Sequence, residues 1–183
     1  MAKIHCFVRR FIQDKPFPFV TFTILKPFVK TIDALIDTGS PFTVLSPRDA
    51  IASRLPITKM RSGPSVGLAG HHFLNHPIKN VTIHFKAVEG ESLEIVLPSL
   101  GVLVPTKIDE KIWREIKDIP TILGNDFLED HGLSLHFNPR DRIAYLEIPK
   151  RHENEGPKTN NAIEVGALDG SGTQRSERKR GDE

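Results

Sequence analysis

Apolar and polar residues alternate with a period of two in short segments along most of the chain, and Pro or Gly separates these segments. Such alternation is typical of strands with one face in a core, and Val, Ile, Phe and Thr favour strands. The pattern predicts an all-β core. We expect strands at residues 6–11, 19–25, 31–37, 42–46, 81–88, 93–100, 133–137 and 143–148.

Two short helices are predicted between these strands. In residues 46–55, Ser46 is suited to be the N-cap and Pro47 the first helical residue. A second helix is expected within residues 105–118, where apolar side chains share one face: Ile108, Ile112, Trp113 and Ile116. A face of this kind can bind a partner, but a single apolar stripe favours packing within the same domain.

The composition changes near residue 150. The chain has 183 residues, of which 38% are hydrophobic, enough for one domain with a core. Residues 1–149 are predicted to form that domain. Residues 150–183 are polar and carry charges of both signs, which predicts a disordered tail. Its basic run at 175–180 is interrupted by Glu177, so the sequence does not favour a nucleic-acid partner.

Charge, cysteine content and hydropathy narrow the classes further. The formal net charge is +2, which gives no electrostatic reason to expect nucleic acid or an anionic membrane. Cys6 is the only cysteine, so no intrachain disulfide forms, and a reducing cytoplasm is the expected location. No apolar run approaches the roughly 20 residues that span a bilayer, and no signal peptide is recognised, so no membrane partner is expected.

The segment 34–46, ALIDTGSPFTVLS, ends an apolar strand in a carboxylate surrounded by small residues. Gly39 allows a sharp turn and can present its N–H to the Asp37 carboxylate. We expect the Ser40 hydroxyl to donate to the same carboxylate, which favours its ionised form. Thr38 adds a small side chain that can bond a neighbouring backbone.

One carboxylate is not sufficient to hydrolyse an amide, because the reaction needs both a base and an acid. Two carboxyl groups that share one proton supply both, since like charges about 3 Å apart do not both ionise. The chain contains one Asp-Thr-Gly and no Asp-Ser-Gly. A twofold dimer brings a second copy of the same residue to the axis.

The segment 34–46 resembles the catalytic segment of the retropepsins, the retroviral-type aspartic peptidases, and of their cellular relatives. Residues 121–137 are similar to the second motif of that family, in which two apolar residues and a glycine precede a short helix. The resemblance implies a closed β-barrel or sandwich with one or two short helices and a flap hairpin, active as a twofold dimer. It implies an aspartic endopeptidase without metal or organic cofactor, acting on extended polypeptides.

The same resemblance assigns roles to single residues. Asp37 would be the catalytic residue, contributed once by each protomer, and Thr38 would hydrogen-bond across the dimer axis. Gly39 and Ser40 would bond the carboxylate. The second motif, which would pack behind the catalytic loop, corresponds to Ile122, Leu123 and Gly124. The flap would lie within residues 65–73, with a tip formed by Gly67, Leu68, Ala69 and Gly70.

Other interpretations remain open. The same fold and dimer can serve as a non-proteolytic dimerisation or peptide-binding module. The chain can also be part of a larger polyprotein from a mobile element. His71, His72 and His76 are interpreted as solvated loop residues in preference to metal ligands, because Pro77 argues against a helix. The short helix after Gly124 is expected to be capped and solvated by nearby polar residues: Asp126, Glu129, Asp130 and His131.

Overall fold

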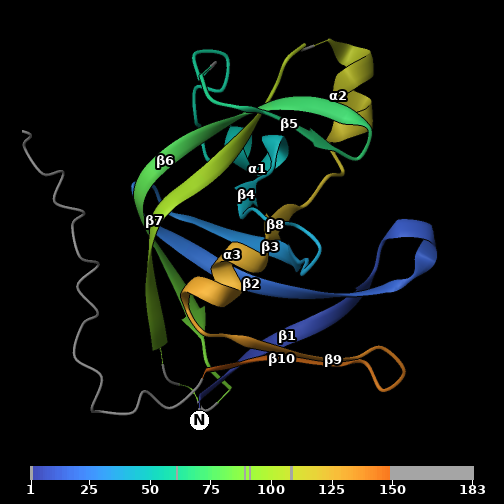
Figure 1. Cartoon of the computed structure of the whole chain (residues 1–183), viewed down its shortest axis with the longest axis vertical. Helices are drawn as coiled ribbons and strands as arrows, with labels where there is room; N and C mark the ends of the chain where they lie inside the picture. The colour runs from blue at the N-terminus through green and yellow to red at the C-terminus, as the bar shows by residue number, and fades with distance from the viewer. Residues whose placement is uncertain (1, 61, 89, 91, 108, 149–183) are drawn as a thin grey trace, which may run out of the picture. The chain divides into compact units, whose positions relative to one another are not determined.

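The computed structural model describes residues 2–60, 62–88, 90, 92–107 and 109–148. The predicted tail at 150–183 and Ile108 lie outside the described residues. The strands are β1 (Ala2–Arg10), β2 (Pro16–Lys26), β3 (Lys30–Ile36), β4 (Val44–Leu45), β5 (Ser65–Leu68), β6 (His71–Lys86), β7 (Ser92–Pro105), β8 (Thr121–Leu123), β9 (Ser134–Asn138) and β10 (Ile143–Ile148) (Figure 1). The helices are a 3-10 turn at Ile12–Asp14 and α1 (Pro47–Ala52), α2 (Glu110–Ile116) and α3 (Asn125–Asp130).

Six of the strands close into a barrel. The ladder runs from β6 through β7, β4, β8 and β3 to β2, and β2 pairs again with β6. The sheet continues beyond β2 through β1 and β10 to β9, while β5 pairs with β6 alone. The predicted all-β class with a closed barrel is therefore confirmed, and the two parallel pairs β3–β8 and β4–β7 lie in the barrel wall.

The barrel interior holds the main hydrophobic core. Three aromatic rings form its centre: Phe85 lies 5.7 Å from Phe22 and 5.9 Å from Phe127, measured between ring centroids. All three side chains are buried. A second cluster lies between β5, β6 and α2 and contains Phe73 and Ile116. Burial of side chains of this size contributes roughly 1.5–3 kcal/mol each to folding.

The helices form where capping residues and apolar stripes predict them. The Ser46 side chain accepts from the Asp49 N–H, and Pro47 is the first residue of α1. Helix α2 buries Ile116 and packs Ile112 and Trp113 against the second cluster, as the interpretation of internal packing predicts. Neither helix, nor any other in the described part of the chain, is long and apolar enough to cross a membrane.

The histidine segment is not the loop expected from its Asn and Pro content. His72 and His76 lie in β6, which begins at His71, ten residues before the predicted strand. Pro77 is opposite Gly101 of β7. Strand β2 pairs with β6 from Thr82 to His84, five residues or more beyond Pro77. Proline is accepted here because the side of the strand away from β7 has no ladder partner to lose.

Candidate active site

Asp37 follows directly after β3, in the middle of the barrel wall. Ala34, Leu35 and Ile36 are buried, so the strand is fixed by burial up to the residue before Asp37. The Asp37 N–H donates to the Leu123 carbonyl over 3.0 Å, which extends the pairing with β8 by one residue. The carboxylate itself is half-buried at the point where the chain leaves the sheet.

In the turn after Asp37, the bonds to this residue come from backbone N–H groups and not from side chains. The Gly39 N–H donates to Asp37 Oδ1 over 2.9 Å, as expected, and the Ser40 N–H donates to the Asp37 carbonyl over 3.0 Å. The prediction that the Ser40 hydroxyl donates to the Asp37 carboxylate is wrong. That hydroxyl donates to the Phe42 carbonyl over 2.9 Å, because it closes a local turn two residues further on. Thr38 is exposed, and its hydroxyl has no hydrogen bond within the described chain.

The second motif lies directly behind this turn. Ile122 and Leu123 are buried in β8. A Cβ at Gly124 would lie 2.5 Å from the Phe42 carbonyl oxygen and 2.8 Å from the Ser40 carbonyl oxygen. Glycine is therefore required at this position for the two loops to approach each other. The approach is secured by the next residue, whose N–H (Asn125) donates to the Ser40 carbonyl over 2.7 Å.

Asp126 bonds the start of α3, as expected, because its Oδ1 accepts from the Phe127 N–H over 2.7 Å, but it also bonds a residue far away in the sequence. Its Oδ2 accepts from the Thr43 N–H over 2.9 Å, and its Oδ1 accepts from the Thr43 hydroxyl over 2.7 Å. The Thr43 hydroxyl also accepts from the Gly124 N–H over 3.0 Å. The cap of α3 is Gly124 itself, which has no side-chain bond to offer. Asp126 therefore fixes the loop that carries Asp37 to the second motif.

A buried polar network that the sequence did not indicate connects α1 to β8. Thr121 Oγ1 donates to Asp49 Oδ2 over 2.7 Å and accepts from the Ser46 N–H over 3.1 Å. The Ser46 hydroxyl donates to the same Asp49 oxygen over 3.0 Å. All three residues are buried. A buried network whose polar groups are satisfied fixes one arrangement of α1 against β8.

The cleft beside Asp37 is covered by the β5–β6 hairpin. Leu68 pairs with His71 across a two-residue turn in which Ala69 and Gly70 have φ of 50° and 79°. Two positive φ values are the mark of a type I′ hairpin turn, so the predicted hairpin is present at the predicted residues. Gly67 lies within β5 and needs no special backbone conformation.

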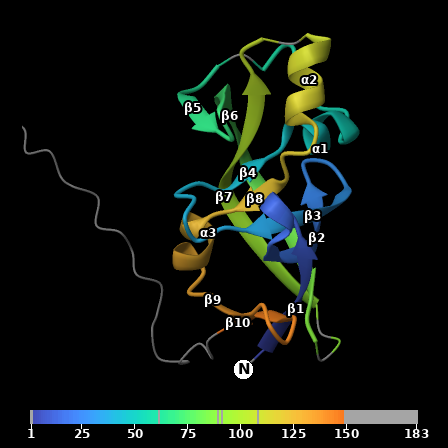
Figure 2. The same ribbon diagram turned by 90° about the vertical axis from the view of Figure 1, so that its right-hand side faces the viewer.

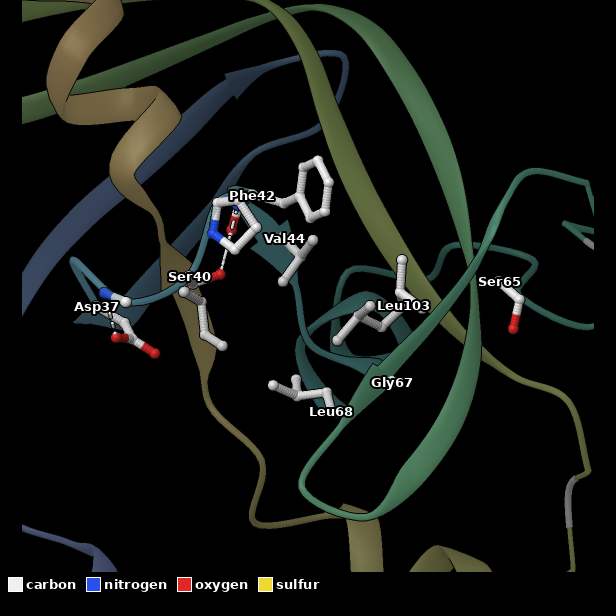
Figure 3. Close-up of a pocket in the computed structure, with 12 residues that line it drawn as sticks. Asp37, Ser40, Phe42, Val44, Ser65, Gly67, Leu68 and Leu103 are labelled. Carbon is white, nitrogen blue, oxygen red and sulfur yellow. Dashed lines mark hydrogen bonds between the residues drawn. The ribbon is translucent and has the colours of Figure 1, made fainter.

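The cleft has a volume of about 440 Å³ and largely apolar walls. Figure 3 shows Asp37 near one end of this cleft, with Leu68 of the hairpin and Leu103 of β7 among its other lining residues. Of the lining residues that the structure describes, Asp37 is the one with an ionisable side chain. No group of three or more His, Cys, Asp or Glu side chains suited to a metal ion occurs within the described residues.

The fold and the cleft define an all-β barrel protein with a carboxylate at the end of a wall strand, beneath a hairpin. No family model and no curated protein matches the sequence. A retropepsin-like aspartic protease from Rickettsia conorii is similar in structure, with a TM-score of 0.44 and 15% identity over 80% of this chain and 89% of that chain. The retroviral protease-like domain of Ddi1 from Leishmania major is similar with a TM-score of 0.40 and 15% identity, over 77% of this chain and 98% of that chain.

Proposed function

We propose that this protein is an aspartic endopeptidase whose active site forms when two copies meet about a twofold axis, each supplying one Asp37. The observation that carries the proposal is the position of this carboxylate. It is half-buried at the end of β3 and lines an apolar cleft beneath the hairpin. The single motif of the chain provides half of a catalytic dyad.

The chemistry requires the second copy. One Asp37, ionised, takes a proton from a water that attacks the peptide carbonyl, while the other, protonated, donates to the carbonyl oxygen; the roles then exchange. The Gly39 N–H donates to Oδ1 of Asp37 over 2.9 Å and so orients the carboxylate. Thr38 is exposed next to the carboxylate, where its hydroxyl can bond the opposite loop across the axis.

The substrate is an extended polypeptide. Strand β5 pairs with β6 on one side and has no partner on its other side within the described chain. A peptide in the cleft can add to such an edge through its main chain. The apolar side chains of Val44, Val66 and Ile122 line the same space, so apolar substrate side chains are accepted there.

Replacement of Asp37 by Asn tests the proposal. The variant keeps the size of the side chain but removes its acid–base function, so cleavage of an unfolded protein substrate should be abolished while the dimer persists in sedimentation. Asp33→Asn is the matched control: Asp33 lies on β3, the strand that leads to Asp37, where it is exposed, bonded to Thr21 and outside the cleft. An inert wild-type dimer would instead support a dimerisation or peptide-binding module.

A mixing experiment tests whether each site uses two copies of Asp37. Wild type and Asp37→Asn are unfolded together in equal amounts and refolded, so that dimers form at random. If both carboxylates are needed, about a quarter of the dimers retain two and the activity per dimer falls to about a quarter. If one carboxylate suffices, the mixture retains between about half and about three quarters of the wild-type activity per dimer, and the shared dyad is rejected.

A further inference from the structure

A second groove lies away from the cleft, between the β1–β2 hairpin and the β9–β10 turn. Figure 1 shows both connections projecting on the same side, the first in blue and the second in orange. Figure 2, seen from that side, shows them at the front of the molecule. The groove has a volume of about 440 Å³, the same as the cleft beside Asp37. It is lined by Phe7, Val8, Arg9, Arg10, Pro16, Pro139 and Arg142.

One wall of this groove is an unpaired strand edge. Strand β1 pairs with β10 from Ala2 to Cys6 and with β2 from Cys6 to Arg10. From Phe7 to Arg10 the side of β1 that faces away from β2 therefore has no ladder partner within the described chain. Strand β10 begins only at Ile143, after the turn from β9, so it does not extend alongside this part of β1.

The prolines of β2 determine which backbone groups this edge offers. Val8 is opposite Pro18, and Arg10 is opposite Pro16. Proline has no N–H, so the alternating bonds between β1 and β2 run through the pairs formed by Phe7 and Arg9. The N–H and C=O groups of Val8 and Arg10 then point to the open side, where an extended chain can pair with them.

The side chains show that the groove runs along this edge. Successive residues of a strand point to opposite faces of the sheet. Phe7 and Arg9 belong to one face of β1, and Val8 and Arg10 belong to the other, yet all four line the same groove. A space bordered by both faces lies at the edge of the strand, in line with the sheet.

Positive charge surrounds the edge. Arg9, Arg10 and Arg142 line the groove, and no acidic side chain lines it among the described residues. Arg10 is paired with the exposed Asp14. Arg9 and Arg142 form no ion pair in the described part of the chain, and Arg9 lies over the Phe19 ring at 5.7 Å. Two guanidinium groups are thus available for carboxylates.

We propose that this groove binds an extended acidic segment of a partner protein, which adds as a strand to β1 at Val8 and Arg10. Its alternate side chains place carboxylates against Arg9 and Arg142, and its main chain pairs with the open edge. Charged residues on edge strands can also serve only to prevent aggregation, and that role predicts no binding of such a segment. The proposal does not depend on peptidase activity.

The probe is a fluorescein-labelled octapeptide of alternating Thr and Glu, titrated with the full chain while anisotropy is measured and the peptide is checked for cleavage. We expect saturable binding that weakens with salt. Arg9→Gln with Arg142→Gln should weaken it at least roughly tenfold, because both carboxylate partners are lost. Arg114→Gln, an exposed arginine of α2, should leave the affinity within about twofold.

Two further probes separate strand addition from charge attraction. The same octapeptide with every Thr N-methylated keeps its charge but has no N–H at those positions, and it should lose most of its affinity. A Thr-Lys octapeptide should not bind. The proposal is overturned if the acidic peptide fails to bind, or if its N-methylated form binds equally well. It is also overturned if the Arg9 and Arg142 variant, with unchanged thermal unfolding, binds the peptide like wild type. Single-stranded DNA that binds as tightly as the peptide would overturn it as well.

Discussion

Thr43 and Asp126 are joined by two hydrogen bonds although they lie 83 positions apart in the chain. The Thr43 hydroxyl also accepts from the Gly124 N–H, so one side chain serves both as donor and as acceptor. The pair connects the loop after Asp37 to the start of α3. The position of the proposed catalytic carboxylate therefore depends on residues outside the Asp-Thr-Gly motif.

Replacement of Thr43 by Val keeps the shape of the side chain and removes both hydroxyl bonds. The Gly124 N–H is then left buried without a partner, which costs roughly 1–3 kcal/mol of the free energy of unfolding. Urea unfolding measures this loss. In the proposed enzyme, peptide cleavage falls as well because the Asp37 loop is no longer fixed.

Thr31→Val is the matched control for this substitution. Thr31 is exposed on β3, and its hydroxyl bonds only the Thr23 hydroxyl. Its stability should change by no more than about 0.5 kcal/mol. Equal losses in the two variants would show that the bond between Thr43 and Asp126 does not stabilise the loop.

An added methyl group should destabilise the protein at Gly124 but not at Gly67. In Gly124→Ala the new Cβ meets backbone oxygens of Phe42 and Ser40 within 3 Å, so one of the two loops has to move. We expect a loss of roughly 1–3 kcal/mol or more in unfolding free energy. In Gly67→Ala the new Cβ meets no atom within 4 Å, and the stability should be nearly unchanged. A Gly124→Ala protein as stable as Gly67→Ala would contradict the close approach seen here.

The periodic pattern predicted much of this fold from residues that act locally. Ser46 and Pro47 indicate the start of α1, and the Asp-Thr-Gly segment indicates a strand that ends in a turn. These features depend on neighbours in the sequence. For the same reason, the expected bond from Gly39 to Asp37 was right.

Features set by distant partners were not predicted. Asp126 bonds Thr43, 83 positions away, in addition to the Phe127 N–H at the start of α3. An acidic residue in the first turn is typical of a helix start, so the sequence context indicates the bond within α3 but not the bonds to Thr43. Likewise Pro77 suggests a loop, and only the pairing with β7 explains why a strand accepts it.

Ala69 is strained in the hairpin turn. Its φ of 50° lies in the left-handed region, which costs L-residues other than Asn and Asp roughly 1–2 kcal/mol. Asn-Gly is the preferred pair in a type I′ turn, so Ala69→Asn should raise the free energy of unfolding by roughly 0.5–1 kcal/mol. Ala69→Val should lower it, because a β-branched residue fits this conformation worse. Thermal unfolding of both variants checks the signs, and a stabilising Val would refute the turn assignment.

We expect His131 to make the stability of the domain depend on pH near neutrality. It follows α3 and lies 5.2 Å from the Phe127 ring, measured between centroids. Burial lowers the pKa of His131 below its usual value of 6.5, and the neighbouring Asp130 carboxylate opposes this only in part. The neutral form is therefore the one that the folded protein prefers.

The sign of the effect follows from proton binding. As the pH falls through 6.5, His131 is protonated in the unfolded chain before it is protonated in the folded one, so protons favour unfolding. The stability that the neutral histidine provides is present above about pH 7.5, falls as the pH decreases through 6.5, and falls no further below the folded pKa.

His131→Gln should flatten this part of the pH profile, measured by urea unfolding between about pH 5.5 and 8, where carboxylates remain largely ionised. His5→Gln, at an exposed position of β1, should leave the profile unchanged. If His131→Gln keeps the full decrease, another group is responsible, and burial of His131 has no thermodynamic consequence in this range.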